Sequence, residues 1–476
     1  MENLNVCLIN DSFPPEIDGV ANAVTNYAQI ISEDFGRATV VTPSHPEADD
    51  SGFAFPVIRY PSVDMTKFVG YRAGIPFSPE VMKRLEEARF DLIHSHCPIT
   101  STLFARALRD RINVPLVFTY HTKFDIDIAN AIKNRLLREE AARLLAQNIS
   151  ACDEVWTVSR GAGENLRKLG YEGEYLVMPN GVDFPKGRVS DQLIAQVDGG
   201  YDLPAELPVF LYVGRMMWYK GIRITLDALK MLRDRGVDFR MVFVGAGNDK
   251  EEICDYCGFL GLDGKVFFVP PIHDRNLIRA WYCRADVFLF PSTFDTNGLV
   301  VREAAACALP SVLVAGSCAA EDVTDGVNGF LIEENAGSMA AILQRLCAEQ
   351  ELIKRVGEGA QRDLYLSWEN SVKAAYDRYQ TVIENYKAGL YPQHERFSDE
   401  LCHAAAKAMD DLYRGRERQQ NAYSEMRSNL EEIRSEIKDG RERVREKLDE
   451  FSQRIDRFLG GRECFLAGDR DKLCRA

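Results

Sequence analysis

A glycine-containing loop in the second half of the chain could bind an anion. In it Gly214–Arg215 follows the apolar run Phe210–Val213, and Lys220–Gly221 lies just before a segment with helical periodicity. Gly245 lies in a second loop, Val242–Gly247, for which the alternative is a simple tight turn between a strand and a helix. Glycine lets the backbone approach a ligand, and a helix N-terminus with a nearby arginine and lysine attracts negative charge. These residues predict an anion site, most simply for phosphate.

A further loop, Pro291–Ala304, places two carboxylates around the start of another helix. Asp295 lies at the mouth of the loop, the helix is expected to begin near Gly298, and Glu303 lies about a turn and a half inside it. Free N–H groups of a first helical turn can hold phosphate oxygens, and carboxylates can accept hydrogen bonds from sugar hydroxyls. The alternative is that Asp295 only caps the helix and that Glu303 is a surface charge.

Candidate metal ligands are present but incomplete. His94 and His96 could form a pair, yet no obvious carboxylate or thiolate set completes it. The motif Cys254–Cys257 lacks a second cysteine pair, and Asp125–Asp127 falls within a helical segment. The 12 cysteines are scattered singly through apolar runs, which is typical of reduced core residues. We expect neither a metal nor a cofactor.

The elements that must position these residues alternate along most of the chain. Short, continuous apolar runs are typical of strands buried on both faces, and helical stretches separate them. This alternation predicts parallel sheets covered by helices. The runs expected as strands are Val6–Ile9, Thr39–Val41, Leu92–His94, Leu116–Thr119, Val155–Val158, Phe210–Val213, Arg240–Val244, Val266–Val269, Val287–Phe290 and Val312–Val314.

Linker-like residues between 180 and 208 interrupt this rhythm, so we expect two doubly wound, Rossmann-like α/β domains that face a cleft. The predicted boundaries are 1–185 for an acceptor-side domain, 186–370 for a nucleotide-sugar-binding domain and 371–394 for a helix that crosses back to the first domain. Residues 395–476 form a charged helical extension. Its apolar residues between 423 and 458 repeat at heptad spacing, which favours a coiled coil and self-association.

Composition narrows the functional classes. The formal net charge is −14, and an acidic chain is a poor nucleic-acid binder. No apolar run reaches the roughly 18 residues of a membrane span, and the N-terminus does not resemble a signal peptide. We therefore expect a cytoplasmic protein.

The combined motifs resemble those of glycosyltransferase family 4, a group of nucleotide-sugar enzymes with the GT-B fold. The resemblance rests on the Gly-Arg and Lys-Gly pairs and on the two acids, and it extends from about residue 5 to 388. Three further segments fit in the right order: Pro14–Val20, Asn180–Asp183 and Asp325–Phe330.

This resemblance implies roles for the site residues. Arg215 and Lys220 would grip the diphosphate, Glu303 would hold the ribose, Asp295 would bind sugar hydroxyls, and His121 would touch the donor sugar from across the cleft. The remaining substrate-binding residues would be Gly19, Gly214, Gly245, Asn297, Gly298 and Leu299. The resemblance also implies transfer with retention of the anomeric configuration. Because the two cations supply positive charge, the enzyme would work without a metal.

A narrower resemblance suggests a lipid acceptor. The segments His96–Pro98, Pro115–Thr122 and Asp295–Leu299 look like those of bacterial diacylglycerol glucosyltransferases. A predicted helix with Lys133, Arg135, Arg138 and Arg143 could also rest on an anionic bilayer, on the inner face of the plasma membrane. The alternative for this helix is an ordinary core helix with a charged outer face.

We therefore expect transfer of a hexose, with UDP-glucose as donor, to a lipid such as diacylglycerol. The alternative acceptor is a cell-wall component, a polysaccharide or another glycolipid. More distant alternatives are a GT-B nucleotide-sugar epimerase and a non-catalytic coiled-coil scaffold.

Overall fold

The computed structural model describes residues 3–16, 18–64, 72–75, 78–125, 128 and 132–392, with four isolated positions beyond them (446, 449, 450 and 453). The chain divides into two compact units, Met1–Ala406 and Lys407–Ala476. The predicted heptad residues between 423 and 458 lie outside the described residues. No helix in the described ranges is long and apolar enough to span a membrane.

The first domain is built on a seven-stranded parallel sheet in the order β3-β2-β1-β6-β7-β8-β9. Its strands are β1 (Asn5–Ile9), β2 (Arg37–Pro43), β3 (Val57–Tyr60), β6 (Leu92–Ser95), β7 (Leu116–Tyr120), β8 (Glu154–Thr157) and β9 (Leu176–Val177). Helices are α1 (Gly19–Ile30), a π-helical turn (Ile31–Phe35), α3 (Pro79–Glu87), α4 (Thr100–Ile112), α6 (Arg135–Ser150) and α7 (Arg160–Lys168). A separate antiparallel pair is formed by β4 (Ser62–Asp64) and β5 (Arg72–Gly74).

The second domain contains a six-stranded parallel sheet in the order β12-β11-β10-β13-β14-β15. Its strands are β10 (Val209–Val213), β11 (Arg240–Val244), β12 (Val266–Val269), β13 (Val287–Phe290), β14 (Ser311–Val314) and β15 (Phe330–Ile332). Its helices are α8 (Asp191–Asp198), α9 (Ile222–Asp234), α10 (Lys250–Phe259), α11 (Arg275–Arg284), α12 (Leu299–Ala306), α13 (Ala336–Ala348) and α14 (Gln350–Asp363), with short 3-10 turns at Trp218–Lys220 and Cys318–Ala320.

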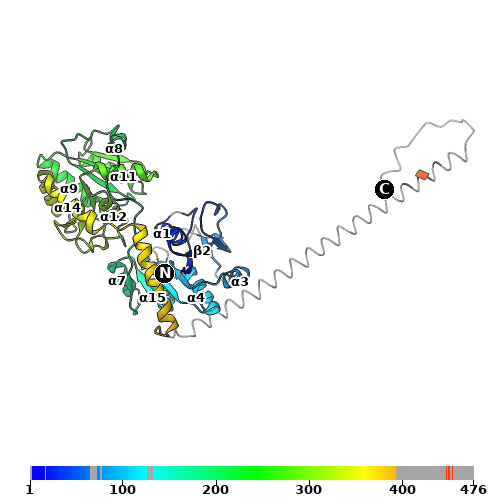
Figure 1. The fold of residues 1–476 in the computed structure, drawn as a ribbon. Helices are drawn as coiled ribbons and strands as arrows, with labels where there is room; N and C mark the ends of the chain where they lie inside the picture. Colours follow the sequence, from blue (N-terminus) through cyan, green and yellow to red (C-terminus); the bar gives the residue numbers. More distant parts are fainter. Residues whose placement is uncertain are drawn as a thin grey trace, which may run out of the picture. The chain divides into compact units, whose positions relative to one another are not determined.

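The last described helix, α15 (Trp368–Lys387), follows the second domain but packs into the core of the first (Figure 1). The Tyr376 hydroxyl accepts a hydrogen bond from the Leu4 amide at 2.7 Å, and the Tyr379 hydroxyl lies 2.6 Å from His94 Nδ1. These buried contacts join residues 372 and 285 positions apart, so α15 ties the end of the second domain to the first sheet.

The predicted pair of doubly wound domains is confirmed. The central strands of both sheets are fully buried, as their unbroken apolar runs predict. The strands that the pattern did not reveal are β3, β9 and β15, which lie at the edges of the two large sheets, and the antiparallel pair β4 and β5. All five are only two to four residues long. β3 alternates between buried and half-buried residues, and β9 and β15 are apolar but very short.

Candidate active site

A cavity of about 520 Å³ lies between the loops that follow the strands of the two sheets. This volume falls within the range of roughly 300–1,000 Å³ that small-molecule sites occupy. All predicted site residues line the cavity except Gly245 and Glu303. Those that line it are Gly19, His121, Gly214, Arg215, Lys220, Asp295, Asn297, Gly298 and Leu299.

Lys220 and Asp295, predicted to bind different parts of the donor, form an ion pair with each other. Lys220 Nζ lies 2.6 Å from Asp295 Oδ1, while Ser292 Oγ donates to Asp295 Oδ2 at 2.5 Å. The ammonium also lies 5.6 and 5.5 Å from the ring centroids of Tyr219 and Phe294. The lysine is only 6% exposed, so its charge is fixed at the cavity wall. Arg215, by contrast, is exposed.

The N-terminus of α12 opens onto the cavity through Gly298, not through a capping Asp295. Gly298 is the N-cap residue, with φ of 59° and no side-chain cap. A Cβ there would lie 2.8 Å from Ala319 Cβ, so a larger residue would be both strained and crowded. The Val301 amide donates to the Gly298 carbonyl at 2.8 Å, whereas no side chain caps the amides of Leu299 and Val300, which remain available to an anion.

Gly245 packs against the Gly214–Arg215 loop without lining the cavity itself. A Cβ on Gly245 would lie 2.1 Å from the carbonyl oxygen of Gly214. Because only glycine permits this approach, Gly245 positions the Gly214–Arg215 loop by packing against it.

Glu303 is buried, not a surface charge, and it is held by two partners. Its Oε1 accepts from Arg275 at 2.6 Å and its Oε2 from the Tyr282 hydroxyl at 2.9 Å. Burial raises the pKa of Glu303, and the Arg275 guanidinium opposes that rise. Arg275 also pairs with Asp183, at the predicted domain junction. Glu303 is therefore not among the residues that line the cavity, and its carboxylate belongs to a network with Arg275 and Tyr282 that the sequence did not reveal.

The first-domain wall contains two further residues, Asp11 and His96, that sequence reasoning missed as site residues. His96 Nδ1 lies 3.0 Å from His121 Nε2. Asp11 Oδ1 accepts from the amide and the hydroxyl of Ser101 at 2.9 and 2.6 Å. Both residues follow strands at the cleft edge, β1 and β6, and this position is the signal that could have identified them.

Burial keeps the two histidines neutral. It lowers the pKa of His121 to about 3 and holds the pKa of His96 well below its usual range. The His94 ring packs against His96, with 4.0 Å between the ring centroids, but its own nitrogens lie within hydrogen-bond distance of the Tyr379 and Thr119 hydroxyls.

The two domains touch directly beside the cavity. Thr296 Oγ1 donates to the His121 carbonyl at 2.8 Å, and Lys123 Nζ donates to the Thr293 carbonyl at 3.3 Å. The Pro291–Ala304 loop is therefore held against the residues that follow β7.

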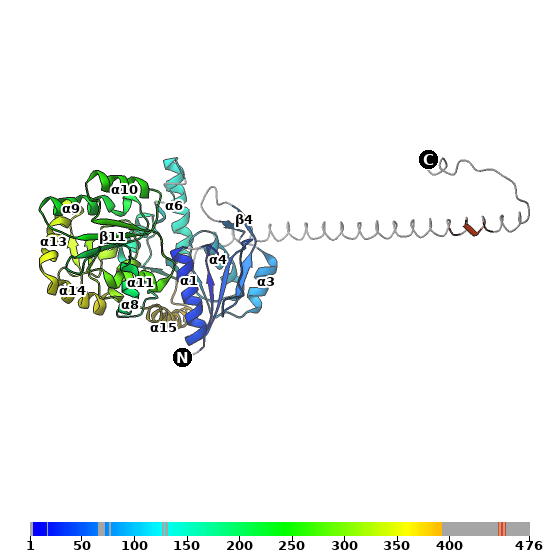
Figure 2. The same cartoon turned by 90° about the horizontal axis from the view of Figure 1, so that it is seen from above.

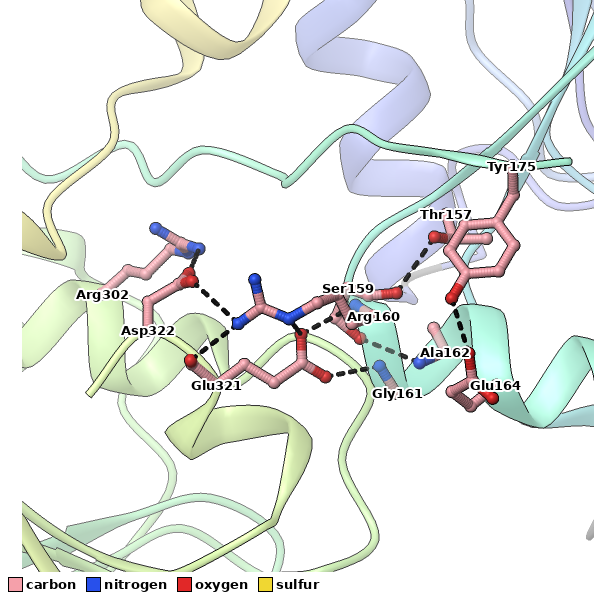
Figure 3. Close-up of polar contacts among 10 residues, drawn as sticks. All are labelled: Thr157, Ser159, Arg160, Gly161, Ala162, Glu164, Tyr175, Arg302, Glu321 and Asp322. Carbon is pink, nitrogen blue, oxygen red and sulfur yellow. Dashed lines mark hydrogen bonds and ion pairs between the residues drawn. The ribbon is translucent and has the colours of Figure 1, made fainter. Parts of the chain in front are cut away.

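A second set of contacts joins the domains at the start of α7 (Figure 3). The Glu321 carboxylate, from the second domain, accepts the Arg160 amide at 2.7 Å and also the Gly161 amide. The Arg160 guanidinium donates to the Glu321 carbonyl at 2.7 Å and lies 3.5 Å from Asp322, which also pairs with Arg302. A carboxylate at a helix N-terminus is favourable because it satisfies free N–H groups and matches the helix dipole.

Replacing Glu321 by alanine should therefore loosen the start of α7. We expect amide hydrogen exchange at Arg160 and Gly161 to accelerate by roughly tenfold or more, since hydrogen bonds to a charged group contribute about 1.5–3 kcal/mol. Glu164→Ala is the matched control, because Glu164 lies on the same helix and accepts from the Tyr175 hydroxyl of its own domain (Figure 3). Equal exchange rates in both variants would contradict this role of Glu321 at the start of α7.

Known proteins resemble this chain at the level of sequence. It is 29% identical over 320 residues to the D-inositol 3-phosphate glycosyltransferase of Geodermatophilus obscurus, covering 64% of this chain and 69% of that protein. It is 25% identical over 362 residues to the Sulfoquinovosyl transferase SQD2 of Arabidopsis thaliana, covering 73% of this chain and 67% of that protein.

Solved structures share the fold. Anabaena Alr3699/HepE in complex with UDP superposes with a TM-score of 0.63 at 18% identity, covering 79% of this chain and all of that one. The sucrose-phosphate synthase of Thermosynechococcus elongatus superposes with a TM-score of 0.62 at 20% identity, covering 80% of this chain and 100% of that one.

Two family models match the two domains in turn. Residues 17–185 match the model described as Glycosyltransferase Family 4, and residues 198–363 match the model described as Glycosyl transferases group 1. These matches cover the whole second sheet, the first sheet apart from β1, and most of the loops that line the cavity. The chain is therefore a glycosyltransferase of the GT-B type, with a family 4 domain followed by a group 1 domain.

Proposed function

We propose that this glycosyltransferase moves glucose from UDP-glucose to a lipid acceptor such as diacylglycerol, with retention of the anomeric configuration. The assignment of a nucleotide-sugar donor rests on one observation, the cavity wall that contains Lys220, Arg215 and the open N-terminus of α12. Three groups that attract anions converge there, as binding of a nucleoside diphosphate requires.

These groups suit the chemistry as well as the binding. When the bond between the anomeric carbon and the diphosphate breaks, negative charge grows on the leaving group. Fixed donors such as Lys220, aimed at that charge in a water-poor site, can contribute about 3–4 kcal/mol each. The acceptor oxygen forms the new bond to the anomeric carbon, and its proton leaves with the products. We assign the nucleotide as UDP and the sugar as glucose by family resemblance, and the complexes of Anabaena Alr3699/HepE with UDP and with UDP-glucose support that assignment.

Helix α6 supports a lipid acceptor. Leu136, Leu137 and Leu144 are 74%, 60% and 53% exposed, so they do not serve as core residues. In Figure 2 one end of α6 projects past the neighbouring ribbons. Its charges are partly neutralised, because Arg135 pairs with Glu139 and Arg143 with Glu140. The exposed leucines of α6 therefore support membrane contact more strongly than its basic side chains do. The membrane contact that we propose is peripheral.

A phosphorylated cyclitol is the second candidate acceptor, because the relatives above include D-inositol 3-phosphate glycosyltransferases. A cell-wall or polysaccharide acceptor is the third. The test is a panel of nucleotide sugars crossed with diacylglycerol vesicles, inositol phosphate and water-soluble glycans, with products identified by mass. Glucosyl-diacylglycerol formed from UDP-glucose is the expected product. Transfer to another acceptor would overturn the lipid assignment, while an epimerised donor without transfer, or no donor binding, would overturn the proposed function.

Activity should survive an excess of EDTA. Lys220 and Arg215 supply positive charge where metal-dependent enzymes use a cation, so we expect the rate of UDP release to change less than about twofold. The measurement compares initial rates with and without EDTA on enzyme purified without added metal. Loss of activity that manganese or magnesium restores would contradict this role for the two cations.

A further inference from the structure

Three polar atoms on the first-domain wall of the cavity have no hydrogen-bond partner among the described residues. They are Asp11 Oδ2, His96 Nε2 and His121 Nδ1. Each side chain is more than nine-tenths buried, at 6%, 2% and 7% exposure, and each lines the cavity. Leaving a buried polar group unpaired costs about 1–3 kcal/mol, so three such groups on one wall indicate that a ligand satisfies them.

The histidine pair restricts what that ligand must offer. Both rings are neutral, and they share one hydrogen between His96 Nδ1 and His121 Nε2. If His96 donates, its Nε2 is a free acceptor and His121 Nδ1–H is a free donor; if His121 donates, the two roles are exchanged. In either case the pair presents one donor and one acceptor. A hydroxyl group can meet both, because it donates and accepts.

Asp11 adds a requirement for a donor. Its Oδ1 accepts two hydrogen bonds from Ser101 and a longer one, at 3.4 Å, from the Tyr60 hydroxyl, and its Oδ2 has no hydrogen-bond partner among the described residues. Burial raises the pKa of Asp11, and the hydrogen bonds from Ser101 oppose that rise. The neighbouring Cys97 thiol is a weak donor, and burial raises its pKa well above the usual value. A carboxylate oxygen next to a cavity binds a hydroxyl hydrogen and repels an anion.

The charges on the two walls agree with this division. Among the described residues that line the cavity, the first-domain wall carries the carboxylates of Asp11 and Asp18 and no lysine or arginine, whereas the opposite wall carries Arg215 and Lys220 besides the single carboxylate of Asp295, which pairs with Lys220. Phosphate groups belong on the second-domain wall, and uncharged groups belong on the first.

We propose that Asp11 and His96, together with His121, bind vicinal hydroxyl groups of an uncharged polyol, and that Asp11 excludes a phosphate group from this position. The hydroxyls are those of the transferred sugar or those of the acceptor. The proposal rests on the glycosyltransferase activity, but not on the identity of the lipid.

Asp11→Asn tests the carboxylate with little disturbance of the fold. The amide oxygen can still accept both hydrogen bonds from Ser101, while the free carboxylate oxygen becomes an NH2 donor. We expect the Kd for UDP to stay within about twofold of wild type. Either the Kd for UDP-glucose or the KM of the acceptor found active in the panel should rise by roughly tenfold or more, since a hydrogen bond to a charged group contributes about 1.5–3 kcal/mol.

The matched control is Asp91→Asn. Asp91 lies in the same domain, and its carboxylate accepts the Asn5 amide at 2.7 Å, outside the cavity lining. The Asp91→Asn variant should change neither the Kd for UDP-glucose nor the KM of the acceptor.

Two substitutions of His96 separate ligand binding from the positioning of His121. An asparagine amide reaches about as far as Nδ1 and can keep the bond to His121, whereas a glutamine amide reaches about as far as Nε2. If His96 binds a hydroxyl directly, His96→Asn should weaken the same constant that Asp11→Asn weakens, and His96→Gln should weaken it less. The reverse order would overturn a binding role for His96.

The two sources of the hydroxyls give different results. Weaker binding of UDP-glucose with unchanged binding of UDP assigns them to the transferred sugar; a raised acceptor KM with unchanged binding of UDP-glucose assigns them to the acceptor. If Asp11→Asn changes neither constant, or weakens UDP and UDP-glucose equally, the proposal is wrong. A wild-type protein that binds no UDP-sugar would instead refute the proposed function.

Discussion

Lys220→Ala should lower kcat by roughly 100-fold or more, which corresponds to about 3 kcal/mol of lost transition-state stabilisation. The lysine is 6% exposed and its Nζ lies 2.6 Å from Asp295 Oδ1. Its ammonium is therefore held in place before the substrate arrives, and its removal takes away a fixed charge while leaving Asp295 without its cation. The measurement is single-turnover release of UDP under donor saturation.

A matched lysine is available in the same domain. Lys230 pairs with Asp234 on the exposed face of α9, and Lys230→Ala should leave kcat unchanged. The companion variant Asp295→Ala should keep the affinity for UDP, since it leaves Lys220 in place, but it should reduce sugar transfer. A Lys220→Ala enzyme that folds and retains kcat within a few-fold of wild type would show that the leaving group lies elsewhere.

Glu303→Ala should weaken the binding of UDP by roughly ten- to 100-fold. The resemblance gives this carboxylate the ribose, and hydrogen bonds to a charged group contribute about 1.5–3 kcal/mol. The structure adds a second effect. Glu303 is the shared acceptor of Arg275 and Tyr282, so its removal leaves a half-buried guanidinium and a buried hydroxyl short of a partner. We therefore expect a lower melting temperature as well.

Two measurements separate these effects. Calorimetric titration with UDP reports the ribose contact, and thermal unfolding without ligand reports the network. Glu303→Gln preserves the shape and should lose less stability than Glu303→Ala. Glu358→Ala, on the exposed face of α14, is the control for a simple loss of charge. A variant that loses stability but binds UDP as tightly as wild type would restrict Glu303 to a structural role.

Much of the fold is encoded locally and could be predicted. A strand buried on both faces must be apolar at successive positions, so runs such as Phe210–Val213 predict central strands from their own residues alone. Loops that follow such strands lie at the carboxyl edge of a parallel sheet whatever the strand order. For this reason the sequence placed Gly214, Arg215 and Lys220 near the Asp295 loop, and all four line the cavity.

The partners of individual side chains could not be predicted in this way. Lys220 and Asp295, Glu303 and Arg275, and Asp11 and Ser101 are 75, 28 and 90 positions apart. Whether two such groups pair depends on strand order, helix rotation and the closure of one domain on the other, and no local pattern records these.

Burial determines how His96 and Glu303 can act. From its residue type alone His96 could equally bind a metal or face solvent, and Glu303 could be a surface charge. The packed structure leaves each of them less than a tenth exposed, and it lowers the pKa of the histidine and raises that of the glutamate. Local sequence patterns are therefore enough to predict the two domains and the loops around the site. Which polar groups are buried, which pair with one another and which are left for a ligand depends on the folded chain, because desolvation comes from neighbours that are distant in the sequence.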